Sequence, residues 1–199
     1  MPKIKKTYDI FLSYSLDLQS QAEVVAKKFA NAGLAVFDLS ELRPAHNVVE
    51  ETWQALAESW ALVVLVKPGA TPPSVAVEIG AASAWQKPIY ILLEGEGEHH
   101  LPSYFSKYET FKSSEIGKVV ELISKGLKPL NDKDRQALAK AYSDLSIPTD
   151  RLLMEPTSIE QLKNILWKET GLRISGERMM QELIRLRKGG SLPRIQRRK

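Results

Sequence analysis

The stretch SVAVEIGAASAWQKPIY, residues 74–90, combines a helix rich in small residues with the start of a buried strand. We expect the helix to begin at Pro73 or Ser74 and to run to about Trp85, and the strand to cover residues 88–92. Glu78 is the single carboxylate in this stretch. Open α/β sheets bind ligands where helices begin beside the ends of parallel strands. Glu78 therefore either caps its helix or acts on a ligand.

Strand-like and helix-like segments alternate over the first two-thirds of the chain. Continuous apolar runs predict strands at residues 9–15, 34–37, 61–66 and 88–92, with a short edge strand at 109–111. Apolar residues at helical spacing predict helices at residues 18–32, 48–60 and 113–126. Asp17 is placed to cap the first of these helices, and Gly33 to end it. Buried strands separated by helices predict an α/β fold with a parallel sheet covered on both faces.

A helical region without strands follows. We assign residues 1–128 to the α/β domain and residues 129–199 to a small helical extension with a basic tail. Helices are expected at residues 131–145, 159–170 and 176–188, capped by Asn131, by Thr157 or Ser158, and by Ser175. Three helices are too few to form a core that is securely stable alone, so we expect them to dock on the first domain or on a protein partner.

Charge is unevenly distributed between these two regions. Residues 1–130 carry 13 Lys and Arg against 15 Asp and Glu, a net −2, whereas residues 131–199 carry 15 against 9, a net +6. The basic tail favours an acidic partner surface or nucleic acid. Because the last eight residues contain no aromatic side chain for base stacking, sequence-specific RNA recognition is not expected.

The composition indicates a globular protein of a reducing compartment. The chain has 199 residues, 43% of them hydrophobic and 26% charged, and no cysteine. No apolar run approaches the length of a membrane span or of a signal peptide core. We therefore expect a cytoplasmic protein that does not enter a membrane.

Several motifs occur together in a specific order. The first strand ends in FLSYS at residues 11–15, followed by Asp17; GLAVF occupies residues 33–37 and WQALAES residues 53–59; the strand at 63–66 precedes Glu78 and the sequence WQKP at 85–88. In this order the chain resembles a TIR (Toll/interleukin-1 receptor) domain over about residues 7–126. The resemblance implies a flavodoxin-like fold with a five-stranded parallel sheet.

The same resemblance implies one of two functions. Some TIR domains are assembly modules, whereas others, including many bacterial ones in antiphage defence, cleave NAD⁺ at the nicotinamide–ribose bond with a glutamate on the third helix. Glu78 stands at that position, and residues 38–47 correspond to the mobile loop that controls self-association and access to the site. On this basis NAD⁺ is a substrate rather than a cofactor, and the expected substrate-binding residues are Ser13, Tyr14, Ser15, Phe37, Asp38, Arg43 and Ser74.

The chemistry of NAD⁺ cleavage suits a lone carboxylate. Nicotinamide leaves as a neutral molecule, so no general acid is needed. A desolvated carboxylate can stabilise the oxocarbenium-like ribosyl cation or hold the ribose hydroxyls. Water, or a nucleophile on the same molecule, then completes hydrolysis or cyclisation, as expected of an effector or a signal generator. One departure concerns Ser74, because NAD⁺-cleaving members commonly carry an aromatic residue four positions before the glutamate. Trp53 or Trp85 could replace its stacking, but both fit better as core anchors.

Other interpretations remain open. Glu78 can be structural in a non-catalytic TIR scaffold, for which Ser74 is the best sequence argument. The helix containing Glu78 also resembles that of nucleoside deoxyribosyltransferases, whose poorer leaving group requires a second, acidic carboxyl group. Asp9 and Asp38 are either accessory carboxylates or residues at strand ends. His99 and His100 follow three glutamates at alternate positions, but their spacing is not that of an ordered metal site, and no metal is expected.

Overall fold

Five parallel strands form the sheet of the computed structural model, which describes residues 7–41, 48–152, 154–192 and 195. The strands are β1 (Tyr8–Ser13), β2 (Val36–Asp38), β3 (Ser59–Val66), β5 (Ile89–Leu93) and β7 (Glu109–Lys112). Their order is β2-β1-β3-β5-β7, and every neighbouring pair is parallel. This is the flavodoxin-like strand order, so the predicted fold class is confirmed.

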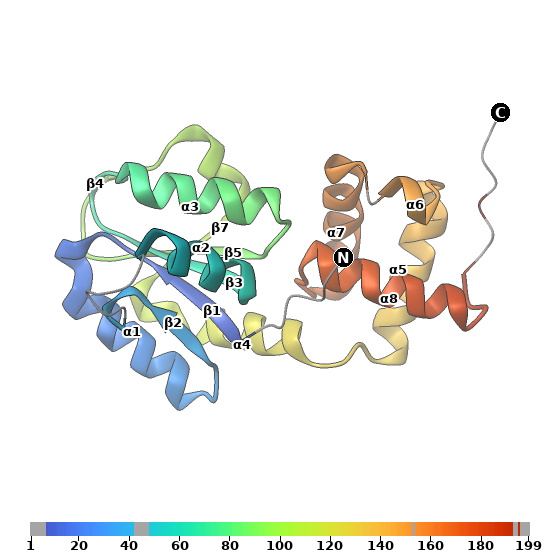
Figure 1. Cartoon of the computed structure of the whole chain (residues 1–199), viewed down its shortest axis with the longest axis horizontal. Coiled ribbons are helices and arrows are strands. Elements are labelled where there is room, and N and C mark those ends of the chain that lie inside the picture. The colour runs from blue at the N-terminus through green and yellow to red at the C-terminus, as the bar shows by residue number, and fades with distance from the viewer. Residues whose placement is uncertain (1–6, 42–47, 153, 193–194, 196–199) are drawn as a thin grey trace. The chain divides into compact units, whose positions relative to one another are not determined.

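Helices cover both faces of this sheet. They are α1 (Gln19–Asn31), α2 (Val48–Glu58), α3 (Pro73–Ala84) and α4 (Ile116–Leu127). Figure 1 shows α1 and α4 on the face of the sheet opposite to α2 and α3. Residues of α2 and α3, such as Leu56 and Ile79, pack with Phe11, Leu62 and Val64 of the strands in one buried cluster. The continuous apolar run of β3 is explained by this burial on both faces.

Short elements connect these strands and helices. They are η1 (Leu16–Leu18), η2 (Leu39–Glu41), β4 (Gly69–Ala70), β6 (His99–His100), η3 (Ser103–Lys107) and η4 (Ser113–Glu115). Strands β4 and β6 pair in parallel through Gly69 with His99 and Ala70 with His100.

Two local predictions in this region are wrong. Asp17 lies inside η1 and caps no helix; its carboxylate forms an ion pair with Lys67 instead. The second helix ends at Glu58 rather than Trp60, and β3 begins at Ser59. The Ser59 hydroxyl donates a hydrogen bond to the carbonyl of Ala55 at 2.7 Å. The first residue of β3 is thus bonded to the last turn of α2.

Chain contacts divide the protein into two compact units. Unit 1 comprises Met1–Ser83 and Lys87–Ser124, and unit 2 comprises Ala84–Gln86 and Lys125–Lys199. The predicted division at residues 128 and 129 stays a prediction, because contact density does not show where a domain folds independently.

The described part of unit 2 consists of helices joined by turns and short irregular segments. Its helices are α5 (Asp132–Leu145), α6 (Thr149–Leu152), α7 (Pro156–Thr170) and α8 (Gly176–Lys188). The caps predicted at Asn131 and Ser175 are confirmed, because their side chains accept backbone N–H groups at 2.8 and 3.2 Å. Gly171 ends α7 in the left-handed conformation, with φ of 64°.

Two helix predictions for unit 2 need correction. The short helix α6 was not expected, because a four-residue helix carries too little periodicity to be recognised. Helix α7 begins at Pro156 rather than after Thr157 or Ser158, as favoured by the fixed φ of proline at a first helical position.

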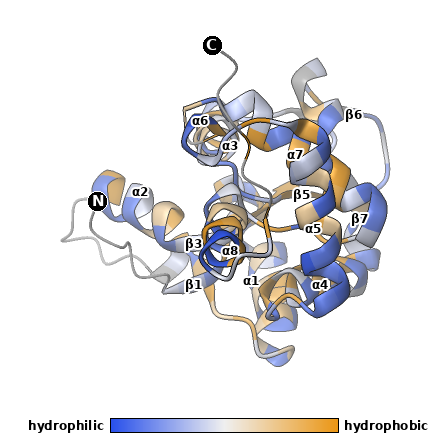
Figure 2. Ribbon diagram, turned by 90° about the vertical axis from the view of Figure 1, so that its right-hand side faces the viewer, coloured by the Kyte–Doolittle hydropathy of each residue, from blue (hydrophilic) through white to orange (hydrophobic). Residues whose placement is uncertain are grey.

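Apolar side chains from all four of these helices form a core of their own. Its buried members include Leu138, Leu152, Leu162 and Leu183. Helices α4 and α8 each carry both hydrophilic and hydrophobic residues (Figure 2), as expected of amphipathic helices. Most of the predicted basic tail, residues 193–194 and 196–199, lies outside the described residues. No helix in the described part of the chain is long and apolar enough to cross a membrane.

Candidate functional site at the carboxyl edge of the sheet

The candidate site lies where β1 and β2 end and α3 passes. Ser13 is the last residue of β1 and is fully buried. Its hydroxyl donates a hydrogen bond to a carboxylate oxygen of Glu78, although the two residues are 65 positions apart in the chain. Only 8% of Glu78 is exposed. The parallel topology thus joins the carboxyl end of a central strand to the carboxylate that the sequence singled out.

Glu78 does not act as a helix cap. It is in the second turn of α3, whose first turn has no acidic residue, and its carboxylate is bonded to β1. Burial raises the pKa of Glu78 above its usual range, and the hydrogen bond from Ser13 opposes that rise. A buried carboxylate with one hydroxyl donor has oxygen lone pairs left to interact with a ligand.

Tyr14 and Asp38 form a second buried pair at the same edge. Leu12 is in register with Asp38, which brings the end of β2 beside the residues that end β1. The Tyr14 hydroxyl donates to Asp38 Oδ1, and the backbone N–H of Ser40 donates to the same oxygen at 3.0 Å. Burial, followed by the hydrogen bond and negative charge of Asp38, raises the pKa of Tyr14. The phenol therefore remains neutral at physiological pH.

The other residues expected to bind substrate differ in burial and in their contacts. Ser15 is half-buried and its carbonyl accepts the N–H of Leu18 at 2.8 Å. Phe37 is buried and stacks on Phe11, with ring centroids 5.2 Å apart, so its ring belongs to the core. Ser74 is exposed in the first turn of α3, one turn before Glu78. Arg43 lies outside the described residues.

Asp9 is at the opposite end of β1 from Ser13 and accepts the backbone N–H of Ala35 at 2.8 Å. Asp9 is therefore not an accessory carboxylate of this site.

The two tryptophans considered for substrate stacking differ in burial. Trp53 packs against the buried cluster of unit 1, as expected of a core anchor. Trp85 is 44% exposed, so its interpretation as a core anchor is wrong.

Sequence reasoning missed one charged pair at the same edge. Lys67 directly follows β3 and pairs with Asp17 on η1, which follows β1. About half of each side chain is exposed, so this ion pair can exchange partners. A lysine immediately after a buried strand was the available signal, but its partner depends on the fold.

The histidine run gives no metal site among the described residues. The ring Nε2 of His99 lies 3.1 Å from the carbonyl of Glu94, and no group of three or more His, Cys, Asp or Glu in the described ranges could hold a metal ion.

The carboxyl edge of the sheet therefore presents three kinds of chemical group. They are the buried carboxylate of Glu78, the Asp38 carboxylate bonded to the Tyr14 phenol, and the half-exposed ammonium group of Lys67.

No family model matches the sequence, and no curated protein matches it either. Solved structures do match. One is a TIR-STING receptor from C. gigas, solved in complex with 2′,3′-cGAMP, at 15% identity and a TM-score of 0.54. The match covers 83% of this chain and 53% of the receptor chain, so this chain spans about half of the receptor's length. The likeness supports a TIR fold.

Two further structures are similar. The TIR domain of the Toll-related receptor TRR-2 from Hydra magnipapillata aligns at 15% identity and a TM-score of 0.46, covering 58% of this chain and 93% of that domain. A second structure of the C. gigas TIR-STING receptor aligns with a TM-score of 0.46 and 15% identity, over 83% of this chain and 54% of the other. At these identities the comparison concerns the fold alone.

Proposed function

We propose that unit 1 cleaves NAD⁺ at the bond between nicotinamide and ribose, with Glu78 as the catalytic carboxylate. The observation that carries the proposal is the burial of Glu78 at the carboxyl edge, where Ser13 fixes its orientation. A carboxylate that is largely removed from water interacts strongly with a positive charge developing beside it.

The proposed reaction needs few protein groups. The glycosidic C–N bond breaks, its electron pair stays on nicotinamide, and the ribosyl cation that remains is stabilised by the Glu78 carboxylate. Water then attacks the cation and releases a proton to solvent. Ser13 positions Glu78 and favours its charged form, since the hydroxyl donates to the carboxylate.

The neighbouring residues fit substrate binding. The Tyr14–Asp38 pair supplies a neutral phenol and a carboxylate oxygen beside the reacting group, which suits the ribose hydroxyls. Lys67 can leave Asp17 for a phosphate of the dinucleotide, because both partners are half-exposed and an ion pair in water contributes little to stability.

We further propose that the enzyme acts in bacterial antiphage defence and is activated by self-association of TIR domains, which would restrain NAD⁺ consumption in the resting cell.

A non-catalytic scaffold is the second candidate. An exposed serine at position 74 replaces the stacking aromatic, and unit 1 exposes large apolar side chains at Leu16, Val48, Val49 and Val77. Exposed apolar side chains favour an assembly surface when they lie together. In this alternative, Glu78 serves only to tie α3 to β1.

The deciding experiment measures nicotinamide release from NAD⁺ by the full-length protein over a range of protein concentrations. Glu78→Gln should lower turnover by about 100- to 1000-fold, the usual loss when one preorganised electrostatic group is removed. Glu121→Gln, an exposed glutamate on α4, is the matched control and should keep full activity. Specific activity should rise with protein concentration.

Three outcomes would contradict the proposal. Full turnover by a folded Glu78→Gln variant would mean that another group is catalytic. Self-association without nicotinamide release at any concentration would favour the scaffold. Base exchange on deoxynucleosides, assayed in parallel, would instead identify a deoxyribosyltransferase.

A further inference from the structure

A groove of about 410 Å³ lies within unit 2, between the first half of α5 and the end of α8. We call it the α5–α8 groove; it is lined by Asp132, Arg135, Gln136, Ala139, Arg185, Leu186, Gly189 and Ser191. Its volume is in the range of small-molecule sites. The groove lies wholly in unit 2 and shares no residue with the candidate site in unit 1.

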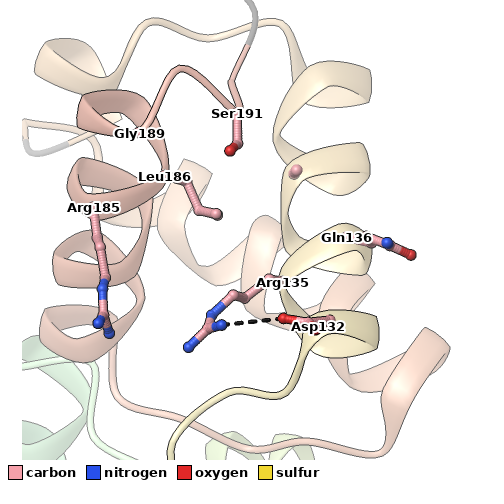
Figure 3. A pocket seen from close by; sticks show the side chains of 8 residues that line it. Asp132, Arg135, Gln136, Arg185, Leu186, Gly189 and Ser191 are labelled. Atoms are coloured by element: carbon pink, nitrogen blue, oxygen red, sulfur yellow. Dashed lines mark hydrogen bonds and ion pairs between the residues drawn. The ribbon is translucent and has the colours of Figure 1, made fainter.

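The walls of the groove differ along its length. Leu186 points into the space between the two helices (Figure 3). Ala139, a residue of α5, also lines the groove. The hydroxyl of Ser191 lies at one end, and the guanidinium groups of Arg135 and Arg185 extend toward the other. The groove thus offers an apolar surface, a hydroxyl and two planar cations.

Both guanidinium groups retain donors for a ligand. Arg135 Nη1 is 3.2 Å from Asp132 Oδ1, but the Asp132 side chain is 93% exposed, so water screens this pair strongly. A guanidinium has five N–H donors, and this contact occupies one of them. Arg185 is 70% exposed, and its Nη1 is 3.8 Å from Glu182, beyond hydrogen-bonding distance.

The nearby carboxylates do not cancel this positive charge. Glu182 is 14% exposed and also faces the half-buried guanidinium of Arg178, whose pKa it raises against the larger lowering caused by burial. The negative charge of Glu182 is therefore shared between two arginines. No acidic residue occurs from Arg185 to the end of the chain.

We propose that the α5–α8 groove binds a nucleoside mono- or diphosphate. Two arginines on different helices can hold a phosphate group in the forked geometry that guanidinium groups favour. The wall formed by Leu186 and Ala139 fits the flat face of a base, and Ser191 can bond the sugar or the base edge. The inference goes beyond the proposed NAD⁺ cleavage and makes unit 2 a receptor for a small anion.

The test measures binding of ADP to the full-length protein by calorimetry, with adenosine, inorganic pyrophosphate and citrate as further probes. Hydrogen exchange locates the binding, since protection should appear in residues 132–139 and 185–191 rather than in unit 1. ADP should bind more tightly than either adenosine or pyrophosphate, because each of those lacks half of the proposed contacts.

Matched variants decide the role of the arginines. The double variant Arg135→Gln with Arg185→Gln should weaken ADP binding at least tenfold, whereas Lys133→Gln with Lys188→Gln, which removes the same charge from exposed positions on the same helices, should not. Arg185→Lys keeps the charge and loses the fork, so intermediate affinity is expected. Thermal unfolding confirms that each variant is folded.

The proposal is overturned by any of three results. They are no detectable binding of ADP at millimolar concentration, ADP binding that the double arginine variant leaves unchanged, and citrate protecting the groove as well as ADP does. None of these results depends on whether Glu78 cleaves NAD⁺.

Discussion

Ser13, at the end of β1, donates its hydroxyl hydrogen to Glu78 in the second turn of α3, and both residues are buried. The contact joins the centre of the sheet to the helix that carries the candidate carboxylate. Burial raises the pKa of Glu78 above its usual range, and the hydrogen bond from Ser13 opposes this rise. The consequences of this pair for activity and for stability can be measured separately.

Removing the Ser13 hydroxyl should move the acid limb of the pH–rate profile upward. Ser13→Ala leaves burial of Glu78 unopposed, so the pKa of the carboxyl rises further and a higher pH is needed to ionise it. At neutral pH, kcat/KM should fall about tenfold, since a hydrogen bond to a charged group contributes about 1.5 kcal/mol or more. Ser13→Thr keeps the hydroxyl and should restore the profile. An acid limb that Ser13→Ala does not move would show that Ser13 does not tune Glu78.

Glu78→Gln should change how stability depends on pH. Below the usual Glu pKa of 4.5, Glu78 is protonated in both the folded and the unfolded protein. As pH rises, the unfolded chain loses this proton first, so the wild-type free energy of unfolding falls until the raised folded-state pKa is passed. Glutamine does not titrate.

In urea unfolding experiments, the stability of the Glu78→Gln variant relative to wild type should therefore increase as pH rises above the usual Glu pKa of 4.5, and level off once the raised folded-state pKa of Glu78 is passed. Glu121→Gln is the control, and its difference from wild type should stay flat. A constant difference for Glu78→Gln across this pH range would mean that the folded-state pKa of Glu78 is not raised.

Tyr14→Phe should destabilise unit 1 by about 1–3 kcal/mol, because it leaves the buried Asp38 carboxylate with one donor fewer. Asp38→Asn is the informative partner: it keeps an acceptor for the phenol and removes the negative charge that raises the pKa of Tyr14. Ultraviolet titration of tyrosinate should therefore detect Tyr14 ionising at a lower pH in Asp38→Asn than in wild type. An identical titration in both proteins would contradict the hydrogen-bonded pair.

Features that depend on neighbouring residues, such as buried strands and helix caps, could be predicted from the sequence, whereas contacts between distant residues could not. Continuous burial of β3 produces an apolar run that is visible without a structure, and Asn131 and Ser175 bond backbone groups three residues away. Glu78 could be placed near the end of β1 through the expected topology. Its bond to Ser13 could not be predicted, because it joins side chains 65 positions apart.

Other features left no local signal. Aspartate is a common helix-capping residue, but the carboxylate of Asp17 pairs instead with Lys67, which follows β3. The groove between α5 and α8 depends on how two amphipathic helices pack, and neither helix shows it alone. Trp85 is exposed in spite of its size, which the apolar pattern of residues 74–90 does not reveal.

Lys87 should be a major contributor to the stability of unit 1. It is 5% exposed, and its ammonium group donates to the carbonyl of Ala57 at 3.1 Å and to that of Ser59, where α2 gives way to β3. Lys87→Met keeps the length of the side chain and leaves these carbonyls without that donor, so we expect a loss of about 1–3 kcal/mol in urea unfolding. Lys27→Met, at an exposed position on α1, should change stability by less than about 0.5 kcal/mol. Equal stability of the two variants would show that the Lys87 contacts add nothing.

Two glycines on α4 should respond oppositely to alanine. A Cβ at Gly126 would lie 2.3 Å from the backbone carbonyl oxygen of Arg173, whereas a Cβ at Gly117 would have no neighbouring atom within 4 Å. Gly126→Ala must therefore push the segment after α7 away, and the overpacking should cost about 1–3 kcal/mol. It would also disturb the carbonyl of Gly126, which accepts a hydrogen bond from Arg178. Gly117→Ala should be neutral or stabilising by up to about 1 kcal/mol, because alanine favours the helix.

Thermal and urea unfolding of both variants, followed by circular dichroism, measures this difference directly. If Gly126→Ala is as stable as Gly117→Ala, the close approach of α4 to Arg173 within unit 2 is absent in solution. If it is destabilised as expected, hydrogen exchange should show a loss of protection in α7 and α8, because Arg173 lies in the segment that joins these two helices.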